Sequence, residues 1–76
     1  MSEREELYRN GRHARVYGAL VAASRGSGRW VDAVTVRAAL REDFPMAVRT
    51  VWEQLRRLER LDVVEHRVGT GLWRLR

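Results

Sequence analysis

The sequence contains no cysteine, no lysine and no isoleucine, and only one of its 76 residues is proline. Without cysteine the chain has no disulfide, no thiolate metal ligand and no thiol nucleophile. No apolar run approaches the roughly 20 residues that span a bilayer, and the polar start Met1–Glu6 does not have the composition of a secretory signal. We therefore expect a cytoplasmic protein with no membrane association.

Motifs for catalysis and metal binding are also missing. His13 and His66 are the only histidines, and the sequence has no HExxH pattern or other metal-ligand spacing. It contains no nucleophile motif, and Gly26-Ser27-Gly28 is too short for a phosphate-binding loop. We expect neither an enzyme nor a bound cofactor, metal ion or small-molecule ligand.

All fifteen basic residues are arginine, and the formal net charge is +5. Residues 1–31 carry six Arg and three Glu, residues 32–45 two Arg and three acids, and residues 46–76 seven Arg and four acids. The positive charge at both ends suits a polyanionic partner, because arginine pairs well with phosphates and guanine edges. The alternative to a polyanionic partner is that the positive charge serves solubility alone. The absence of lysine and isoleucine is, in addition, typical of proteins encoded by a GC-rich genome.

The length allows one domain with one core. Residues 1–11 are expected to form an N-terminal extension, in which Ser2 to Glu5 has the capping-box pattern and a short helix covers residues 3–9. Residues 12–76 are expected to form the domain itself.

Hydrophobic periodicity predicts two helices in the first half of this domain. The first covers residues 12–24 and places on one side Val16, Tyr17, Leu20 and Ala23. The second begins at a cap, either Asp32 or Thr35, and ends at Phe44-Pro45, because a residue before proline is disfavoured in the α region. Its inward residues are Val36, Ala39 and Leu40.

A third helix is predicted over residues 46–61. Its apolar residues recur at steps of three, four and three and share one stripe: Val48, Val51, Leu55 and Leu58. The opposite face is polar and rich in arginine, and it consists of Arg49, Glu53, Arg57 and Arg60, with Thr50 at its edge.

Residues 63–76 alternate between apolar and polar types around Gly69-Thr70-Gly71, which predicts a β-hairpin. The residues expected to face the helices are Val64, His66, Val68, Trp73 and Leu75, whereas Arg74 and Arg76 are expected to point outward. Trp30-Val31 is a candidate third strand, since a two-stranded ribbon is unstable alone. Trp30 is expected to pack under the sheet, and Trp52 either against the hairpin or in a dimer contact.

The segment from Phe44 to Arg76 resembles the second half of the winged helix-turn-helix domains of bacterial and archaeal transcriptional regulators. The matching residues are Thr50-Val51, Leu55, Leu58-Glu59 and Leu61-Asp62-Val63-Val64-Glu65, and Trp73-Arg74-Leu75 is similar to the closing strand. Asp62 stands where those domains usually have glycine, and Ala47 stands where a Ser or Thr often caps the helix. The resemblance implies an α+β fold, mainly α, with three helices and a C-terminal β-hairpin wing.

Resemblance and charge together predict sequence-specific binding of double-stranded DNA by a small transcriptional regulator. Helix 46–61 would enter the major groove, and hairpin 63–76 would lie beside it as the wing. Arg49 and Thr50 are candidates for base contacts, and Glu53 would accept from a cytosine amino group or pair with a neighbouring arginine. The candidate contacts to phosphate or the minor groove are Arg57, Arg60, Arg67, Thr70 and Arg74.

A homodimer is expected, because one such domain covers only a half-site. Two alternatives stay open: a protein-interaction winged helix, such as a phage or plasmid accessory factor, and an excisionase-like protein that bends DNA. An apolar, weakly basic third helix would favour the first alternative, and the arginine-rich face argues against it.

Overall fold

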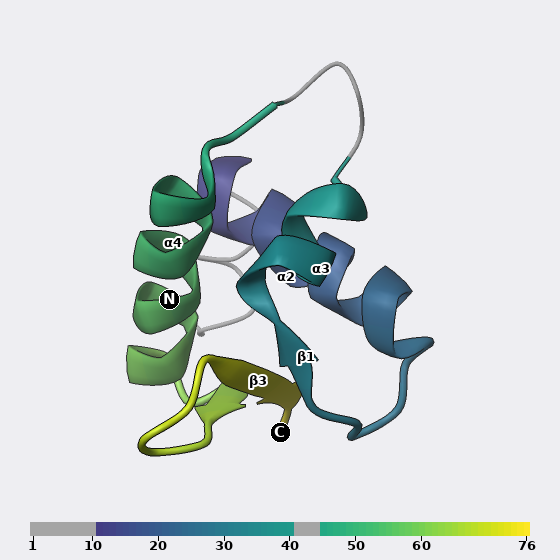
Figure 1. Cartoon of the computed structure of the whole chain (residues 1–76), viewed down its shortest axis with the longest axis vertical. Coiled ribbons are helices and arrows are strands. Elements are labelled where there is room, and N and C mark those ends of the chain that lie inside the picture. The colour runs from purple at the N-terminus through teal and green to yellow at the C-terminus, as the bar shows by residue number, and fades with distance from the viewer. Residues whose placement is uncertain (1–10, 41–44) are drawn as a thin grey trace.

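The computed structural model describes residues 11–40 and 45–76, which form three helices and one three-stranded antiparallel sheet (Figure 1). The helices are α2 (Gly11–Ser24), α3 (Ala33–Ala38) and α4 (Val48–Arg60), and the strands are β1 (Val31–Asp32), β2 (Val64–His66) and β3 (Leu72–Leu75). The expected α+β class, with more helix than strand, is confirmed. The short helix predicted over residues 3–9 lies outside the described residues, as does Phe44.

Helix α2 begins one residue before its predicted start and turns the predicted stripe toward the core. Val16 and Leu20 are fully buried, while Tyr17 and Ala23 are half-buried. The helix ends in a Schellman pattern, in which the Gly26 N–H bonds to the Val21 carbonyl at 2.9 Å. Arg25, with φ of 56°, occupies the left-handed position of this ending.

Helix α3 starts at a capping residue, as its sequence predicts. Of the two candidate caps, Asp32 is the one used: its carboxylate accepts a hydrogen bond from the Thr35 N–H at 2.7 Å. The Thr35 hydroxyl and then the Thr35 N–H, both hydrogen-bonded to this carboxylate, lower the pKa of Asp32 below its ordinary value. Val36 of this helix is fully buried, and Ala39 and Leu40 are half-buried behind it.

The predicted end of α3 at residues 44–45 is wrong, because the helix stops at Ala38. The Ala39 N–H bonds to the carbonyls of both Thr35 and Val36, the second only three residues back, and the Leu40 N–H bonds to the Arg37 carbonyl. Such three-residue spacing tightens the last turn and does not continue an α-helix. Proline therefore does not set the end of this helix, which lies several residues earlier.

Helix α4 begins after Ala47, which makes no side-chain cap. The segment before it is held instead by Arg37, whose Nε donates to the Met46 carbonyl at 2.9 Å. The helix lies within the predicted range 46–61 and buries the predicted stripe: Val51, Leu55 and Leu58 fully, and Val48 partly.

The end of α4 places Asp62 in a backbone conformation that favours glycine. Asp62 has φ of 65°, and its N–H bonds to the Glu59 carbonyl at 3.0 Å. The next N–H, of Val63, reaches back to the Leu58 carbonyl at 3.3 Å and completes a second Schellman ending. The Asp62 carboxylate also forms an ion pair with Arg76.

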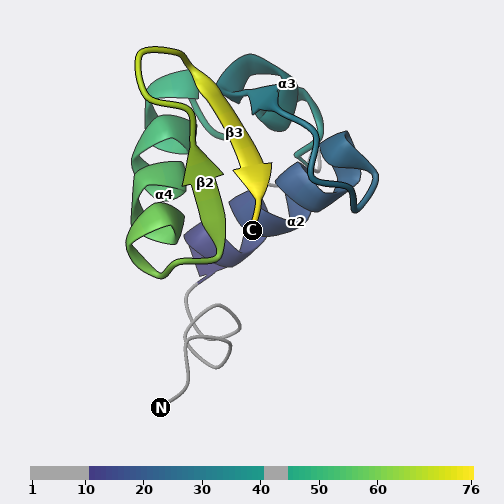
Figure 2. The same ribbon diagram turned by 90° about the horizontal axis from the view of Figure 1, so that it is seen from below.

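The sheet has the strand order β1-β3-β2, so the last strand of the chain lies in the middle. Val31 pairs with Trp73 on one side of β3, and Val64 pairs with Leu75 on the other. A third strand near Trp30-Val31 is thus confirmed, shifted by one residue. Figure 2 shows β2 and β3 beside α4, with the other helices on the same side of the sheet.

Val68 does not face the helices, and that prediction is wrong. Strand β2 ends at His66, and residues 67–71 form the turn, so the alternation of side chains stops before Val68. Gly69 has φ of 81°, and the Thr70 N–H bonds to the Arg67 carbonyl at 3.1 Å, which closes a β-turn around Val68 and Gly69. The Val68 residue is 92% exposed.

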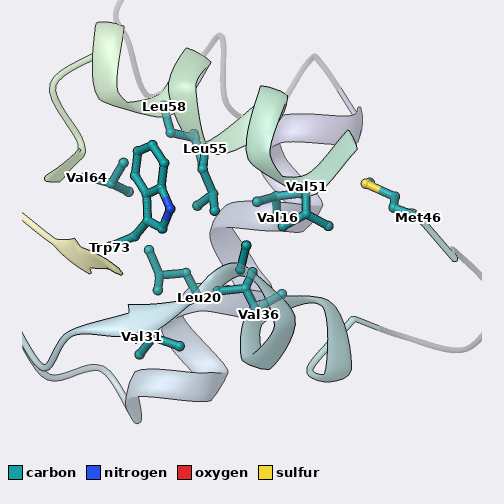
Figure 3. Close-up of a cluster of buried hydrophobic side chains, with 12 residues drawn as sticks. Val16, Leu20, Val31, Val36, Met46, Val51, Leu55, Leu58, Val64 and Trp73 are labelled. Carbon is teal, nitrogen blue, oxygen red and sulfur yellow. The ribbon is translucent and has the colours of Figure 1, made fainter. Parts of the chain in front are cut away.

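The core lies between the helices and the inner face of the sheet. In Figure 3 the indole of Trp73 lies beside Val64 and points toward Leu55 and Leu58 of α4. Trp73 is fully buried, and within the described residues its Nε1 has no hydrogen-bond partner. Trp73 therefore stabilises the fold through its volume and ring contacts, against the cost of one unsatisfied donor. None of the described helices is long and apolar enough to cross a membrane.

Candidate nucleic-acid interface

The outer face of α4 carries four exposed arginines. Because its apolar stripe is held in the core, the opposite side of the helix is presented to solvent. The exposed charged residues of the helix are four arginines and one glutamate: Arg49, Arg56, Arg57, Arg60 and Glu53. The four positions predicted for this face are therefore confirmed as exposed, and Thr50 at its edge is half-buried.

Glu53 lies inside this arginine face and pairs with Arg49. The Arg49 Nε and a Glu53 carboxylate oxygen are 3.8 Å apart, one helical turn from each other. Their side chains are 91% and 63% exposed, so the pair is weak and open to exchange. Of the two roles expected for Glu53, the free protein has the pairing with Arg49, which leaves both groups accessible to a ligand.

Three aromatic rings join α4 to the hairpin. Trp52 meets His66 and Trp73 edge to face, with ring centroids 5.4 and 5.2 Å apart, and His66 stacks on Trp73 at 4.1 Å. Trp52 is thus half-buried against the hairpin, the first of its two predicted environments. Above the outer side of Trp52 lies the guanidinium of Arg56, 5.9 Å from the ring centre. These ring contacts hold the hairpin against the side of α4 that carries Trp52 and Arg56.

The hairpin turn is held by its own polar groups. The Thr70 hydroxyl donates to the Arg67 carbonyl at 2.7 Å and accepts from the Leu72 N–H at 3.3 Å. From the strand, His66 Nε2 donates to the Thr70 carbonyl at 2.6 Å, which requires the proton on that nitrogen. The Thr70 hydroxyl predicted to touch DNA is therefore already used inside the turn.

Arg74 faces away from the core as predicted, but it is engaged within the protein. Its Nε bonds to the carboxylate of Glu65 at 2.5 Å, across the β2–β3 pair. Its guanidinium also lies over the ring of Trp30, 4.4 Å from the centre, so Trp30 packs on the outer face of the sheet and not beneath it. With Arg76 paired to Asp62, the exposed Arg67 is left as the main accessible charge of the hairpin.

The structure places the predicted site residues on two elements that contact each other, α4 and the hairpin. Arg49, Glu53, Arg57 and Arg60 are exposed on α4, and Arg67 is exposed on the hairpin, whereas Thr70 and Arg74 serve the hairpin itself. Sequence reasoning missed Arg56, which stands four residues after Trp52 and therefore above the same side of the helix. It also placed Val68 wrongly, because the strand was extended two residues too far.

In the part of the chain that the structure describes, no group of three or more His, Asp or Glu residues could hold a metal ion. His13 is buried in α2, and His66 belongs to the hairpin. Comparison of the chain with protein-family models, with curated proteins and with solved structures finds no match.

Proposed function

We propose that this chain binds double-stranded DNA as a winged helix-turn-helix domain and acts as a small, sequence-specific transcriptional regulator. In this proposal α3 and α4 are the helix-turn-helix, α4 lies in the major groove, and the β2–β3 hairpin is the wing. The observation that carries the proposal is the exposed arginine face of α4, set directly beside the hairpin. An α-helix fits the major groove, where base pairs present distinct donors and acceptors.

The residues of this surface divide by the contact they would make. Arg49 and Thr50 stand in the first turn of α4, the end with which recognition helices read base edges. Arg57 and Arg60 lie two and three turns further along, where phosphates are within reach of their side chains. Glu53 exchanges its Arg49 pair for a cytosine amino group, or keeps that pair and orients Arg49.

One copy of the domain covers only a short site, so we propose that two copies bind an inverted or direct repeat. Helix α2 and the residues before it would then form the dimer contact, because α4 and the hairpin are occupied by DNA.

The first test is the salt dependence of binding. Duplexes selected from a random pool are titrated with the protein at low and moderate salt, and the affinity is plotted against salt concentration on logarithmic axes. Each neutralised phosphate contributes a slope of about −0.9, so five arginines predict a slope of roughly −4 to −5 per copy. Absence of duplex binding, or binding that does not change with salt, would overturn the proposal in favour of a protein-interaction module.

The second test separates base reading from phosphate contact. Arg49→Ala should lower discrimination between selected and scrambled duplexes by about 1–3 kcal/mol, because a bidentate base contact is lost. Arg67→Ala, its matched control on the hairpin, should weaken both duplexes equally and reduce the salt slope by about 1. If the two variants change discrimination equally, the reading surface is not the start of α4.

A further inference from the structure

Val68 is an apolar side chain held in water at the outermost point of the hairpin. Only two large apolar residues of the described chain are exposed, Val34 at 60% and Val68 at 92%. Burial stabilises a valine side chain, so exposure at the tip contributes nothing to the core. Strand β2 ends at His66, two residues before it, so Val68 does not stabilise the sheet either.

The turn that carries Val68 is held by several hydrogen bonds. The Arg67 carbonyl accepts from both the N–H and the hydroxyl of Thr70, at 3.1 and 2.7 Å. His66 Nε2 donates to the Thr70 carbonyl at 2.6 Å, and His66 itself is stacked on the buried Trp73. These bonds connect the turn, and with it the backbone of Val68, to the buried Trp73.

The turn is also narrow. Val68 and Gly69 are its two central residues, and Gly69 has no side chain, so Val68 is the sole side chain at the tip. A Cβ at position 69 would have no atom within 4 Å, so packing does not require glycine there. The φ of 81° is what favours glycine at this position. A tip with one side chain suits the minor groove, which is only about 6 Å wide.

We propose that Val68 is a wedge that enters the minor groove and opens one base step, so that the protein bends the DNA to which it binds. The inference rests on the proposed DNA binding and adds to it the deformation of the duplex. Apolar side chains inserted between base pairs unstack them and kink the helix by about 20–90°. The Arg67 guanidinium, next to the wedge and exposed, neutralises a phosphate beside the opened step.

A wedge also gives sequence preference at a position that no polar side chain reads. Pyrimidine–purine steps unstack most easily, and A-tracts resist bending. The protein should therefore prefer duplexes in which a TA or CA step lies under the hairpin tip, beside the bases contacted by α4.

The test measures DNA shape and not only affinity. The selected duplex is labelled at its ends with a donor and an acceptor dye, and 2-aminopurine is placed in turn at the steps beside the α4 site. The parent protein should bring the ends closer, by a bend of about 20–90°, and should raise 2-aminopurine fluorescence at one step. Val68→Thr keeps the shape of the side chain but replaces one methyl group with a hydroxyl, and it should abolish both signals.

Two further variants serve as controls for Val68→Thr. Val68→Met keeps an apolar wedge and should retain the bend, whereas Val34→Thr makes the same exchange at the other exposed valine and should leave both signals as in the parent. Because Val68 is exposed, all variants should have the circular dichroism of the parent.

The failures of the two proposals are distinguishable. If the parent binds no duplex, the proposed function falls and the wedge with it. If the parent binds, and Arg49→Ala still lowers discrimination, but Val68→Thr bends the duplex as the parent does, the wedge alone is overturned. A parent complex with a straight, fully stacked duplex has the same consequence.

Discussion

Asp62 occupies a backbone position that favours glycine, since its φ of 65° lies in the left-handed region. The cost for an L-residue there is about 1–2 kcal/mol, and aspartate lowers it only partly through local hydrogen bonding. Its ion pair with Arg76 joins two side chains that are 62% and 53% exposed, so the pair compensates little. The fold keeps the Schellman ending of α4 in spite of this residue.

The effect of a substitution at Asp62 on stability should therefore depend on how readily the new residue adopts a positive φ. Asp62→Gly is expected to raise the free energy of unfolding by up to about 1 kcal/mol, after the greater flexibility of glycine in the unfolded chain is subtracted. Asp62→Ala removes the same carboxylate but keeps a Cβ, and it should lower stability by about 1 kcal/mol. Urea denaturation of the three proteins measures the difference, and equal stability of the two variants would contradict the conformational argument.

At the scale of the helices and strands, most of the fold could be predicted from hydrophobic periodicity. Helices α2 and α4 lie within two residues of their predicted bounds, because each carries a long apolar stripe. The end of α3 could not be predicted in this way. It depends on the tightened last turn at Ala39, whereas the strongest sequence signal, Pro45, lies well beyond it.

The site could be predicted less completely, and the hairpin shows why. The outward face of α4 follows from its own periodicity, so the exposure of Arg49, Glu53 and Arg60 could be predicted without the tertiary structure. The roles of hairpin side chains depend on register, which pairs Glu65 with Arg74 and places Trp30 beside them. No local pattern fixes that register, and Arg74 was therefore given a role in DNA contact although it is already engaged.

The start of α3 offers a test of a single element through pH. Asp32→Ala removes the cap and should cost about 0.5–2 kcal/mol at neutral pH. The pKa of Asp32 is lowered in the folded state, so the unfolded chain takes up a proton first as the solution is acidified. The stabilisation by the carboxylate is thus full above its ordinary pKa of 3.8 and is lost as pH falls through the lower value of the folded state.

The gap in stability between the parent and Asp32→Ala should accordingly narrow below about pH 4, as measured by thermal unfolding across a pH series. Asp32→Asn is the matched control, because asparagine also caps helices but does not titrate in this range. A gap that stays constant down to pH 2 would mean that the charge of Asp32 contributes nothing to the cap.

At the scale of the whole molecule, helix α4 contributes its apolar side to the hydrophobic core and presents its arginine-rich side to solvent. Leu55 is fully buried at the centre of the α4 stripe, and Trp73 of the central strand points toward it (Figure 3). Arg49 lies on the other side of the same helix, with its side chain 91% exposed. The orientation of the candidate interface therefore depends on the packing of Leu55, although Leu55 itself would never touch DNA.

Leu55→Ala should lower the free energy of unfolding by about 2–5 kcal/mol, through lost burial and the cavity left beside Trp73. A domain of this size has about 3–5 kcal/mol in total, so the variant is expected to be largely unfolded at 37 °C. Leu55→Met conserves volume and should cost less than about 1.5 kcal/mol, which keeps the effect measurable by denaturant unfolding if the alanine variant does not fold. Arg49→Ala is the control on the opposite side and should stay within about 0.5 kcal/mol of the parent while it changes DNA discrimination. If Leu55→Ala melts like the parent, α4 does not pack through this stripe, and Arg49, Glu53 and Arg60 do not form a common outer face.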